Sequence, residues 1–230
     1  MGNFKNSLDD FCTFGKSVNN HPITAKDSGK SAEINLYGVI GGYTANLAQF
    51  KRDLDAAGKA DNITICLNTI GGSFADGLPI HNLIKQHPAF ITVKIMGYAL
   101  SIGSVIMLAA NRVECAENGL VMIHRAQGFT YGDAADHQKN AEILQKHEQA
   151  VIPAYARRLG KTEGQVLALL QEETWYTAKE AKAAGLVDAI TNKADMDKAE
   201  ETAGMQGEGL KLINAYRNRP ATLIQRGHYS

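Results

Sequence analysis

The chain has 230 residues, 44% of them hydrophobic and 21% charged, a balance typical of globular proteins and far from that of disordered chains. Its 24 Lys plus Arg match 24 Asp plus Glu, so no net charge attracts nucleic acid or anionic lipid. Cys12, Cys66 and Cys115 are odd in number and form no Cys-x-x-Cys pair, which argues against a disulfide framework and a zinc site. We therefore expect a cytoplasmic protein with no metal, no cofactor and no nucleic-acid partner.

Residues 1–30 show no apolar run flanked by basic residues, so no secretory signal is expected. The most apolar stretch, residues 95–111, is shorter than the ~20 residues that a membrane-spanning helix needs. It also contains several glycines and serines, which favours a buried strand, turn and helix. No membrane association is expected.

Three regions can be separated along the chain. Residues 1–31 are polar and rich in turn signals, which predicts a flexible N-terminal arm. Residues 32–190 alternate between strand and helix patterns and are predicted to form one domain. Residues 191–230 are polar and Gly-rich, and are predicted to form a C-terminal tail.

Within the domain, strands are predicted at 34–39, 63–67, 90–96, 113–115, 120–123 and 186–190. Helices are predicted at 44–56, 76–86, 101–110 and 135–159, the last containing Pro153, and at two sites opened by capping boxes, Thr162 with Gln165 and Thr177 with Glu180. This alternation predicts an α/β fold with a mainly parallel sheet covered by helices. Functional residues are then expected at the carboxyl ends of strands.

The first such end carries Gly71 and Gly72. Paired glycines allow backbone conformations that other residues avoid, and they let a ligand approach main-chain N–H groups closely. This pair could form half of an oxyanion hole, or it could simply make a tight turn between a strand and a helix.

The second end carries Ser101, in a small-x-Ser-x-Gly pattern that follows a strand and opens a helix. Small neighbours are needed where a serine is held on a sharp turn with its oxygen exposed. The same position also suits a serine that only caps the helix. Ser104 is a weaker candidate, because within the helix its hydroxyl is expected to bond back to a carbonyl.

The third end carries His124, the one histidine of seven that directly follows an apolar strand. An imidazole can accept a serine proton near neutral pH and return it to a leaving amine, so activity is expected to rise with pH as His124 loses its proton. The alternative is a buried histidine bonded to a backbone carbonyl. Glu172 and Glu173 are candidates for the acid that orients the imidazole, or they are solvated side chains at a helix end.

Together these residues resemble the Clp protease family, and most closely its phage and prophage branch. The resemblance covers roughly residues 32–190. It is carried by Gly71-Gly72, Gly97-x-Ala99-x-Ser101-x-Gly103, Met122-Ile123-His124, Glu173-Thr174-Trp175-Tyr176-Thr177-Ala178-x-Glu180-Ala181 and Gly185-Leu186-Val187-Asp188.

The resemblance implies a crotonase-like α/β fold and a serine endopeptidase without ATPase activity of its own. In it Ser101 is the nucleophile, His124 the base and Glu173 the acid, and the N–H groups of Gly72 and Ile102 hold the oxyanion. It further implies polypeptide substrates, a homo-oligomer in heptameric or stacked rings with residues 135–159 as the handle helix, and an ATPase unfoldase as a candidate partner. A phage setting would place the protein in the host cytoplasm, with a role in processing head or scaffold proteins.

Two other functions remain open at this point. A crotonase-like acyl-CoA enzyme shares the oxyanion geometry without needing the Ser–His pair. A non-catalytic ring or capsid component would retain the fold alone.

Overall fold

The computed structural model describes residues 24–26, 30–191 and 216–218. Its eight-stranded sheet has the order β1-β2-β3-β4-β5-β8, with β6 paired to the far end of β4 and β7 paired to β6. The strands are β1 (Thr24–Lys26), β2 (Ser31–Tyr37), β3 (Asn62–Thr69), β4 (Phe90–Leu100), β5 (Arg112–Ala116), β6 (Leu120–Ile123), β7 (Thr174–Thr177) and β8 (Ala189–Thr191). The helices are α2 (Leu47–Ala56), α3 (Phe74–Gln86), α4 (Ile102–Met107), α5 (Ala134–Leu159), α6 (Glu163–Gln171) and α7 (Ala178–Ala183).

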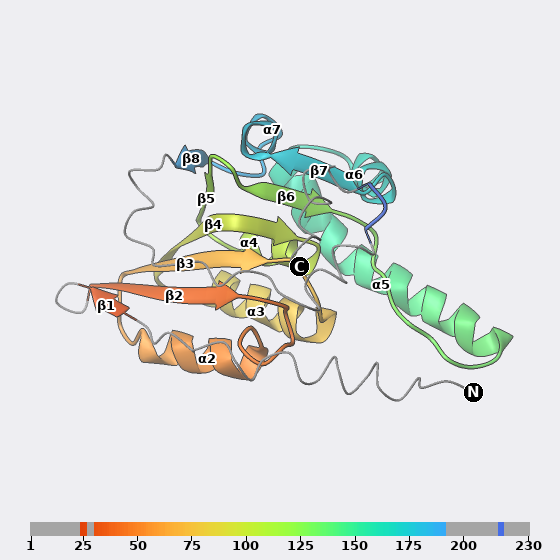
Figure 1. Ribbon diagram of the computed structural model, residues 1–230, viewed down its shortest axis with the longest axis horizontal. Helices are drawn as coiled ribbons and strands as arrows, with labels where there is room; N and C mark the ends of the chain where they lie inside the picture. Colours follow the sequence, from red (N-terminus) through yellow and green to blue (C-terminus); the bar gives the residue numbers. More distant parts are fainter. Residues whose placement is uncertain (1–23, 27–29, 192–215, 219–230) are drawn as a thin grey trace, which may run out of the picture.

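The sheet is mainly parallel, as the sequence predicts. Strands β2, β3, β4, β5, β6 and β8 pair in parallel, whereas β1 and β7 each pair antiparallel with one neighbour. Helix α5 extends beyond the body of the domain, and its first half is largely exposed (Figure 1). The predicted α/β fold with a long projecting helix is therefore confirmed.

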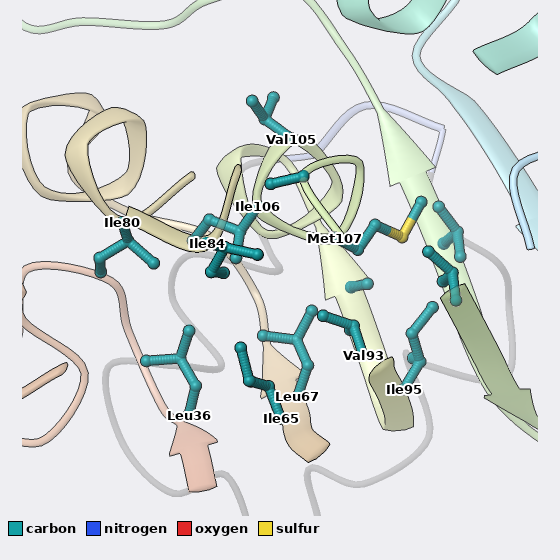
Figure 2. Close-up of a cluster of buried hydrophobic side chains, with 14 of the residues drawn as sticks. Leu36, Ile65, Leu67, Ile80, Ile84, Val93, Ile95, Val105, Ile106 and Met107 are labelled. Atoms are coloured by element: carbon teal, nitrogen blue, oxygen red, sulfur yellow. The ribbon is translucent and has the colours of Figure 1, made fainter. Parts of the chain in front are cut away.

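The core lies between the sheet and helices α3 and α4 (Figure 2). Ile65 and Val93 extend from the central strands toward Ile84 and Ile106 on the helices, and all four are buried. Buried residues recur at every second position along much of β3 and β4, and most of them are apolar, which explains why both strands could be predicted. Burying each such side chain contributes about 1.5–3 kcal/mol.

Both predicted capping boxes are present. Thr162 and Gln165 exchange side-chain to backbone hydrogen bonds at the start of α6, and Thr177 and Glu180 do so at the start of α7. Each box satisfies two backbone donors that the first helical turn leaves free. These contacts fix where α6 begins and where β7 meets α7.

One strand of the domain was not predicted, and the start of the last strand was predicted too early. Strand β7 was missed, although its Thr-Trp-Tyr-Thr sequence is rich in residues that favour strands, because four residues show no clear alternation. The last strand was predicted at 186–190, but it begins only at Ala189. Leu186 and Val187 instead donate backbone hydrogen bonds to the carbonyl of Ala181 and complete the end of α7.

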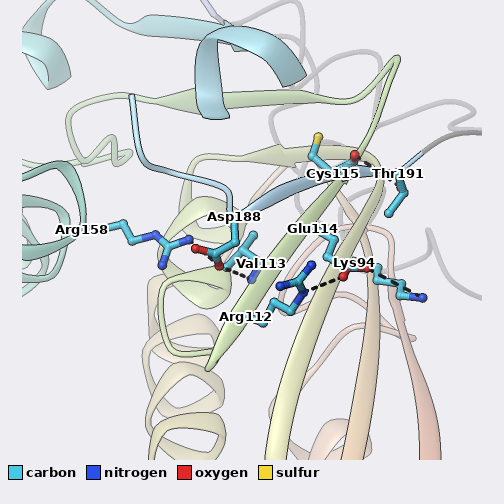
Figure 3. Close-up of polar contacts among 8 residues, drawn as sticks. All are labelled: Lys94, Arg112, Val113, Glu114, Cys115, Arg158, Asp188 and Thr191. Atoms are coloured by element: carbon cyan, nitrogen blue, oxygen red, sulfur yellow. Dashed lines mark hydrogen bonds and ion pairs between the residues drawn. The ribbon is translucent and has the colours of Figure 1, made fainter. Parts of the chain in front are cut away.

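Asp188, between α7 and β8, connects this segment to β5 and α5 (Figure 3). Its carboxylate accepts the N–H of Val113 on β5 at 2.7 Å and pairs with Arg158 of α5 at 2.8 Å. Burial alone would raise the pKa of Asp188, but these two contacts hold it below its ordinary value. The family-like Gly-Leu-Val-Asp segment therefore has a structural role here.

The described part of the chain extends past the predicted domain at both ends. Strand β1 belongs to the predicted arm and pairs antiparallel with β2. Residues 216–218 belong to the predicted tail and lie against the domain near α6 and the end of β6, where Figure 1 draws them in dark blue. The rest of the arm and tail lies outside the described residues. Within the described residues, no helix is both long and apolar enough to cross a bilayer.

Candidate active site

The carboxyl ends of three parallel strands meet at one edge of the sheet. Parallel pairing places Thr69 of β3 beside Ala99 of β4, and Leu100 of β4 beside Met122 of β6. The residues that follow these strands are therefore neighbours in space, although they are far apart in the sequence. The glycine pair, Ser101 and His124 come together in this way.

Ser101 lies on a strained turn between β4 and α4. Its φ of 55° and ψ of −126° are rare for a residue with a side chain, and its hydroxyl does not cap the helix that it precedes. The prediction that the helix starts at Ser101 was therefore off by one residue. The strain turns the side chain away from the helix start, and the backbone is held by hydrogen bonds from Ser101 N–H to the carbonyl of Met122 and from Ser104 N–H to the carbonyl of Ser101.

His124 directly follows β6, and its Nε2 lies 2.7 Å from Oγ of Ser101. This distance is within hydrogen-bonding range, so the hydroxyl can donate to a neutral imidazole. Burial lowers the pKa of His124 to about 4. The negative charge of Glu173 raises it by a smaller amount, and the positive charge of Arg217 lowers it. The ring is therefore neutral, and able to accept a proton, at physiological pH.

Gly71 lies directly against the serine turn, and Gly72 lies against the backbone of Ile40. A Cβ on Gly71 would stand 2.6 Å from Cβ of Ser101, and the φ angles of the two glycines are 99° and 141°. Only glycine fits both the close approach and these backbone angles. Gly72, Ser101, Ile102 and His124 line one cavity of about 310 Å³.

Glu173 reaches the same place from the other side. Strand β7 runs antiparallel to β6 with Thr174 opposite Ile123, which places Glu173 across from His124. Its side chain is only 1% exposed and its φ is 52°. Glu172, the other predicted candidate, ends α6, and its backbone carbonyl accepts the side-chain amide of Asn218.

The expected hydrogen bond between Glu173 and His124 is not formed. Nδ1 of His124 is buried and has no hydrogen-bond partner among the described residues. The carboxylate of Glu173 instead accepts the backbone N–H groups of Arg217 at 2.9 Å and Asn218 at 2.7 Å. Residues 217 and 218 thus donate to both oxygens of the carboxylate that was expected to accept from the imidazole.

Tyr216 is a site residue that the sequence analysis missed. Its ring meets the His124 ring edge-on with centroids 5.2 Å apart, and its hydroxyl donates to the carbonyl of Ile70. Burial raises the pKa of its phenol, and a hydrogen bond with Ser101 opposes that rise. The tyrosines of the polar tail follow no periodic pattern from which this contact could be predicted.

Two polar contacts, one of them fully buried, connect the site to helix α5. The hydroxyl of Ser104 lies 2.5 Å from that of Tyr155 on α5. Arg125 forms a two-bond pair with Glu148 on α5, with both distances 2.9 Å, and Glu148 also accepts the N–H of Ala126. Helix α5 therefore contacts the residues next to both Ser101 and His124.

This arrangement has the parts needed for nucleophilic attack on a carbonyl: a hydroxyl bonded to a neutral base, beside a glycine pair and a helix start. Among residues 24–26, 30–191 and 216–218, no cluster of three or more His, Cys, Asp or Glu could hold a metal ion.

Comparison with known proteins gives concordant matches. The profile of the family described as Clp protease matches residues 30–194. The chain is 28% identical over 159 residues to the ATP-dependent Clp protease proteolytic subunit 1 of Streptomyces avermitilis, an alignment covering 68% of this chain and 72% of the relative. It is 30% identical to the corresponding subunit of Bacteroides fragilis, over 67% of this chain and 76% of the relative. A solved structure of a ClpP1 mutant from Listeria monocytogenes has the same fold, with a TM-score of 0.62 and 24% identity, over 73% of this chain and 94% of that one.

Proposed function

The chain belongs to the Clp protease family, and we propose that it is a serine peptidase that hydrolyses peptide bonds with Ser101 as the nucleophile. The observation that carries the proposal is the 2.7 Å contact between Ser101 Oγ and His124 Nε2 on a strained strand-to-helix turn. Such strain persists only where surrounding structure maintains it, and it is concentrated at functional sites.

In the proposed reaction, Oγ of Ser101 attacks the carbonyl carbon of a substrate peptide while Nε2 of His124 takes the hydroxyl proton. The N–H groups of Gly72 and Ile102 stabilise the oxyanion that develops on the carbonyl oxygen. His124 then gives its proton to the leaving amine, and water hydrolyses the acyl-enzyme by the same route in reverse. Glu173 is the proposed acid, and in that role it would accept the Nδ1–H of His124.

The relatives are proteolytic subunits of an ATP-dependent protease. By analogy we propose that this chain, without ATPase activity of its own, acts in a homo-oligomeric ring in the cytoplasm and accepts polypeptides from an ATPase unfoldase. The exposed first half of α5 would be the handle between stacked rings. We further propose, from the sequence resemblance, a phage or prophage origin and the processing of head or scaffold proteins.

A fluorophosphonate probe tests the nucleophile. We expect the probe to label Ser101, identified by peptide mapping, and Ser101→Ala to abolish labelling and to lower peptidase activity by a factor on the order of 10⁴ to 10⁶. Ser31→Ala, at the start of β2, is the matched control and should leave both unchanged.

Other outcomes would select the alternatives. If the protein converted an acyl-CoA substrate and Ser101→Ala did so at the same rate, a crotonase-like enzyme would be favoured. A folded, ring-forming protein that the probe never labels would favour a non-catalytic ring or capsid component.

A further inference from the structure

Residues 216–218 bind the domain at the proposed active site through several independent contacts. The hydroxyl of Tyr216 donates to the carbonyl of Ile70, and the backbone N–H groups of Arg217 and Asn218 donate to the two carboxylate oxygens of Glu173. The side-chain amide of Asn218 donates to the carbonyl of Glu172. The site thus presents acceptors, and the segment supplies donors to each of them.

Aromatic contacts complete the fit. The ring of Tyr216 is 4% exposed and lies edge-on to both His124, at 5.2 Å, and Trp175, at 6.0 Å between centroids. Edge-to-face pairs in this distance range are favourable beyond the burial of their area. The indole Nε1–H of Trp175 also points to Glu173 Oε1, at 3.4 Å.

These contacts have a consequence for His124. Hydrogen bonds to an ionised carboxylate are stronger than those between neutral groups, so Glu173 is held firmly by the two backbone donors. Nδ1 of His124 is left buried with no hydrogen bond from the described residues. An imidazole that lacks an acid partner is neither oriented nor stabilised as the cation that forms during catalysis.

We propose that Tyr216, Arg217 and Asn218 form an autoinhibitory segment that occupies a peptide-binding site at Glu173 and keeps this acid from His124. Release of the segment frees the carboxylate to accept the Nδ1–H of His124. It also withdraws the Tyr216 ring from the wall of the cavity that Ser101 lines. This inference rests on the proposed peptidase function.

Trp175 offers a readout that does not depend on activity, because it is the only tryptophan in the chain. Its emission reports directly on the Tyr216 ring and on the charge of Glu173. The rate at which a fluorophosphonate labels Ser101 reports on the nucleophile. Both are measured on the full-length protein, with circular dichroism to verify that each variant is folded.

Tyr216→Ala removes both ring contacts, the hydrogen bond to Ile70 and the hydrogen bond with Ser101. Asn218→Pro removes one backbone donor to Glu173 while keeping the Tyr216 ring, so it tests the proposal if Tyr216→Ala fails to fold. The acid partner of a catalytic histidine contributes on the order of 10⁴-fold in rate, so we expect either variant to speed labelling at least about tenfold. Tyr216→Ala should also shift the emission of Trp175.

Matched controls separate the backbone contact from the side chains. Asn218→Ala keeps the backbone donor and loses only the amide bond to Glu172, so it should accelerate labelling less than Asn218→Pro. Tyr43→Ala alters a half-exposed tyrosine between β2 and α2 and should change neither readout.

Each remaining outcome has a definite meaning. The inference is overturned if Ser101 is labelled no faster in folded Tyr216→Ala and Asn218→Pro proteins than in the unmodified chain. It is also overturned if Tyr216→Ala leaves the emission of Trp175 unchanged. Emission that shifts while no protein is ever labelled would instead overturn the proposed serine peptidase, and the inhibitory role with it, and would leave only the docking of the segment.

Discussion

The hydroxyl of Ser104 donates a 2.6 Å hydrogen bond to the carbonyl oxygen of Ser101. Because its single proton is used there, the hydroxyl of Tyr155, 2.5 Å away, must be the donor to Ser104. A left-handed backbone at a residue with a side chain costs on the order of 1–3 kcal/mol, so Ser101 needs such support. The expectation that Ser104 bonds back to a carbonyl is confirmed.

Substitutions in this chain of hydroxyls should have unequal effects. Ser104→Ala leaves the buried Tyr155 hydroxyl without its partner and removes one of the two donors to the Ser101 carbonyl, which keeps only the backbone N–H of residue 104. We expect it to lower the free energy of unfolding by about 2–3 kcal/mol. Tyr155→Phe keeps the bond to Ser101 and should cost only about 1 kcal/mol. Urea unfolding measures both. Equal losses would show that the bond to Ser101 contributes nothing.

The pH dependence of labelling should reveal the burial of His124. An unperturbed imidazole would give a rise centred near pH 6.5. Burial lowers the pKa of His124 to about 4, so the neutral base is already present above that pH. We expect the rate of labelling at Ser101 to rise around pH 4 and to be flat from pH 5 to 8. The sequence alone predicted a rise near neutral pH, and the lowered pKa of the buried ring moves that rise to about pH 4. A midpoint near 6.5 would contradict the buried ring.

Stability should depend on the same group. The unfolded chain protonates His124 with an ordinary pKa near 6.5, whereas the folded chain resists protonation until about pH 4. Between these values the unfolded state binds more protons, so the free energy of unfolding should fall as the pH drops from 6.5 to 4, by about 3 kcal/mol. His124→Gln is the control. It should remove this component of the pH dependence, and an unchanged slope would count against the assignment.

Much of the fold could be predicted because it depends on local patterns. Buried apolar residues at alternate positions mark β3 and β4, and a short apolar run marks β6. Capping boxes mark the starts of α6 and α7. Strand β7 was not predictable in this way. Its four residues are stabilised by pairing with β6, a contact between segments about 50 residues apart that no local pattern records.

The site was predictable in part for the same reason. Ser101 and His124 each follow a recognisable strand, and parallel pairing places the ends of adjacent strands together. The partners of Glu173 could not be predicted, because Arg217 and Asn218 bind it through backbone N–H groups that every residue except proline possesses. The sequence carries no mark of such a contact.

The close approach of Gly71 to Ser101 can be tested with a matched pair of glycines. Gly71→Ala would place a methyl group 2.6 Å from Cβ of Ser101 at a φ of 99°, so we expect labelling of Ser101 to fall and the protein to lose about 2 kcal/mol or more of stability. Gly164, in the first turn of α6, has no atom within 4 Å of such a methyl group. Gly164→Ala should therefore stabilise the protein by about 0.5–1 kcal/mol with labelling unchanged. If Gly71→Ala and Gly164→Ala had the same effects on stability and labelling, the contact between Gly71 and Ser101 would not be tight.

Arg125, directly after His124, forms an ion pair with Glu148 of α5. Arg125 is partly exposed, but Glu148 is only 5% exposed and also accepts the N–H of Ala126. Arg125→Met leaves a buried carboxylate without its cation, and we expect a loss of about 2–3 kcal/mol, below the range for fully buried pairs because water reaches the arginine.

Adding Glu148→Leu to Arg125→Met removes the stranded charge and should restore most of that stability, since apolar replacements of buried pairs are often neutral. Labelling of Ser101 should be slower in the double variant than in the unmodified chain, because the segment after His124 has lost its attachment to α5. Urea unfolding of the two single variants and the double variant gives the coupling energy. Arg125→Met could instead lower the free energy of unfolding equally in the Glu148→Leu background and in the unmodified chain, and the pair would then be uncoupled. In that case only β6 and the hydrogen bond from the Arg125 N–H to the carbonyl of Leu170 would hold His124 in position.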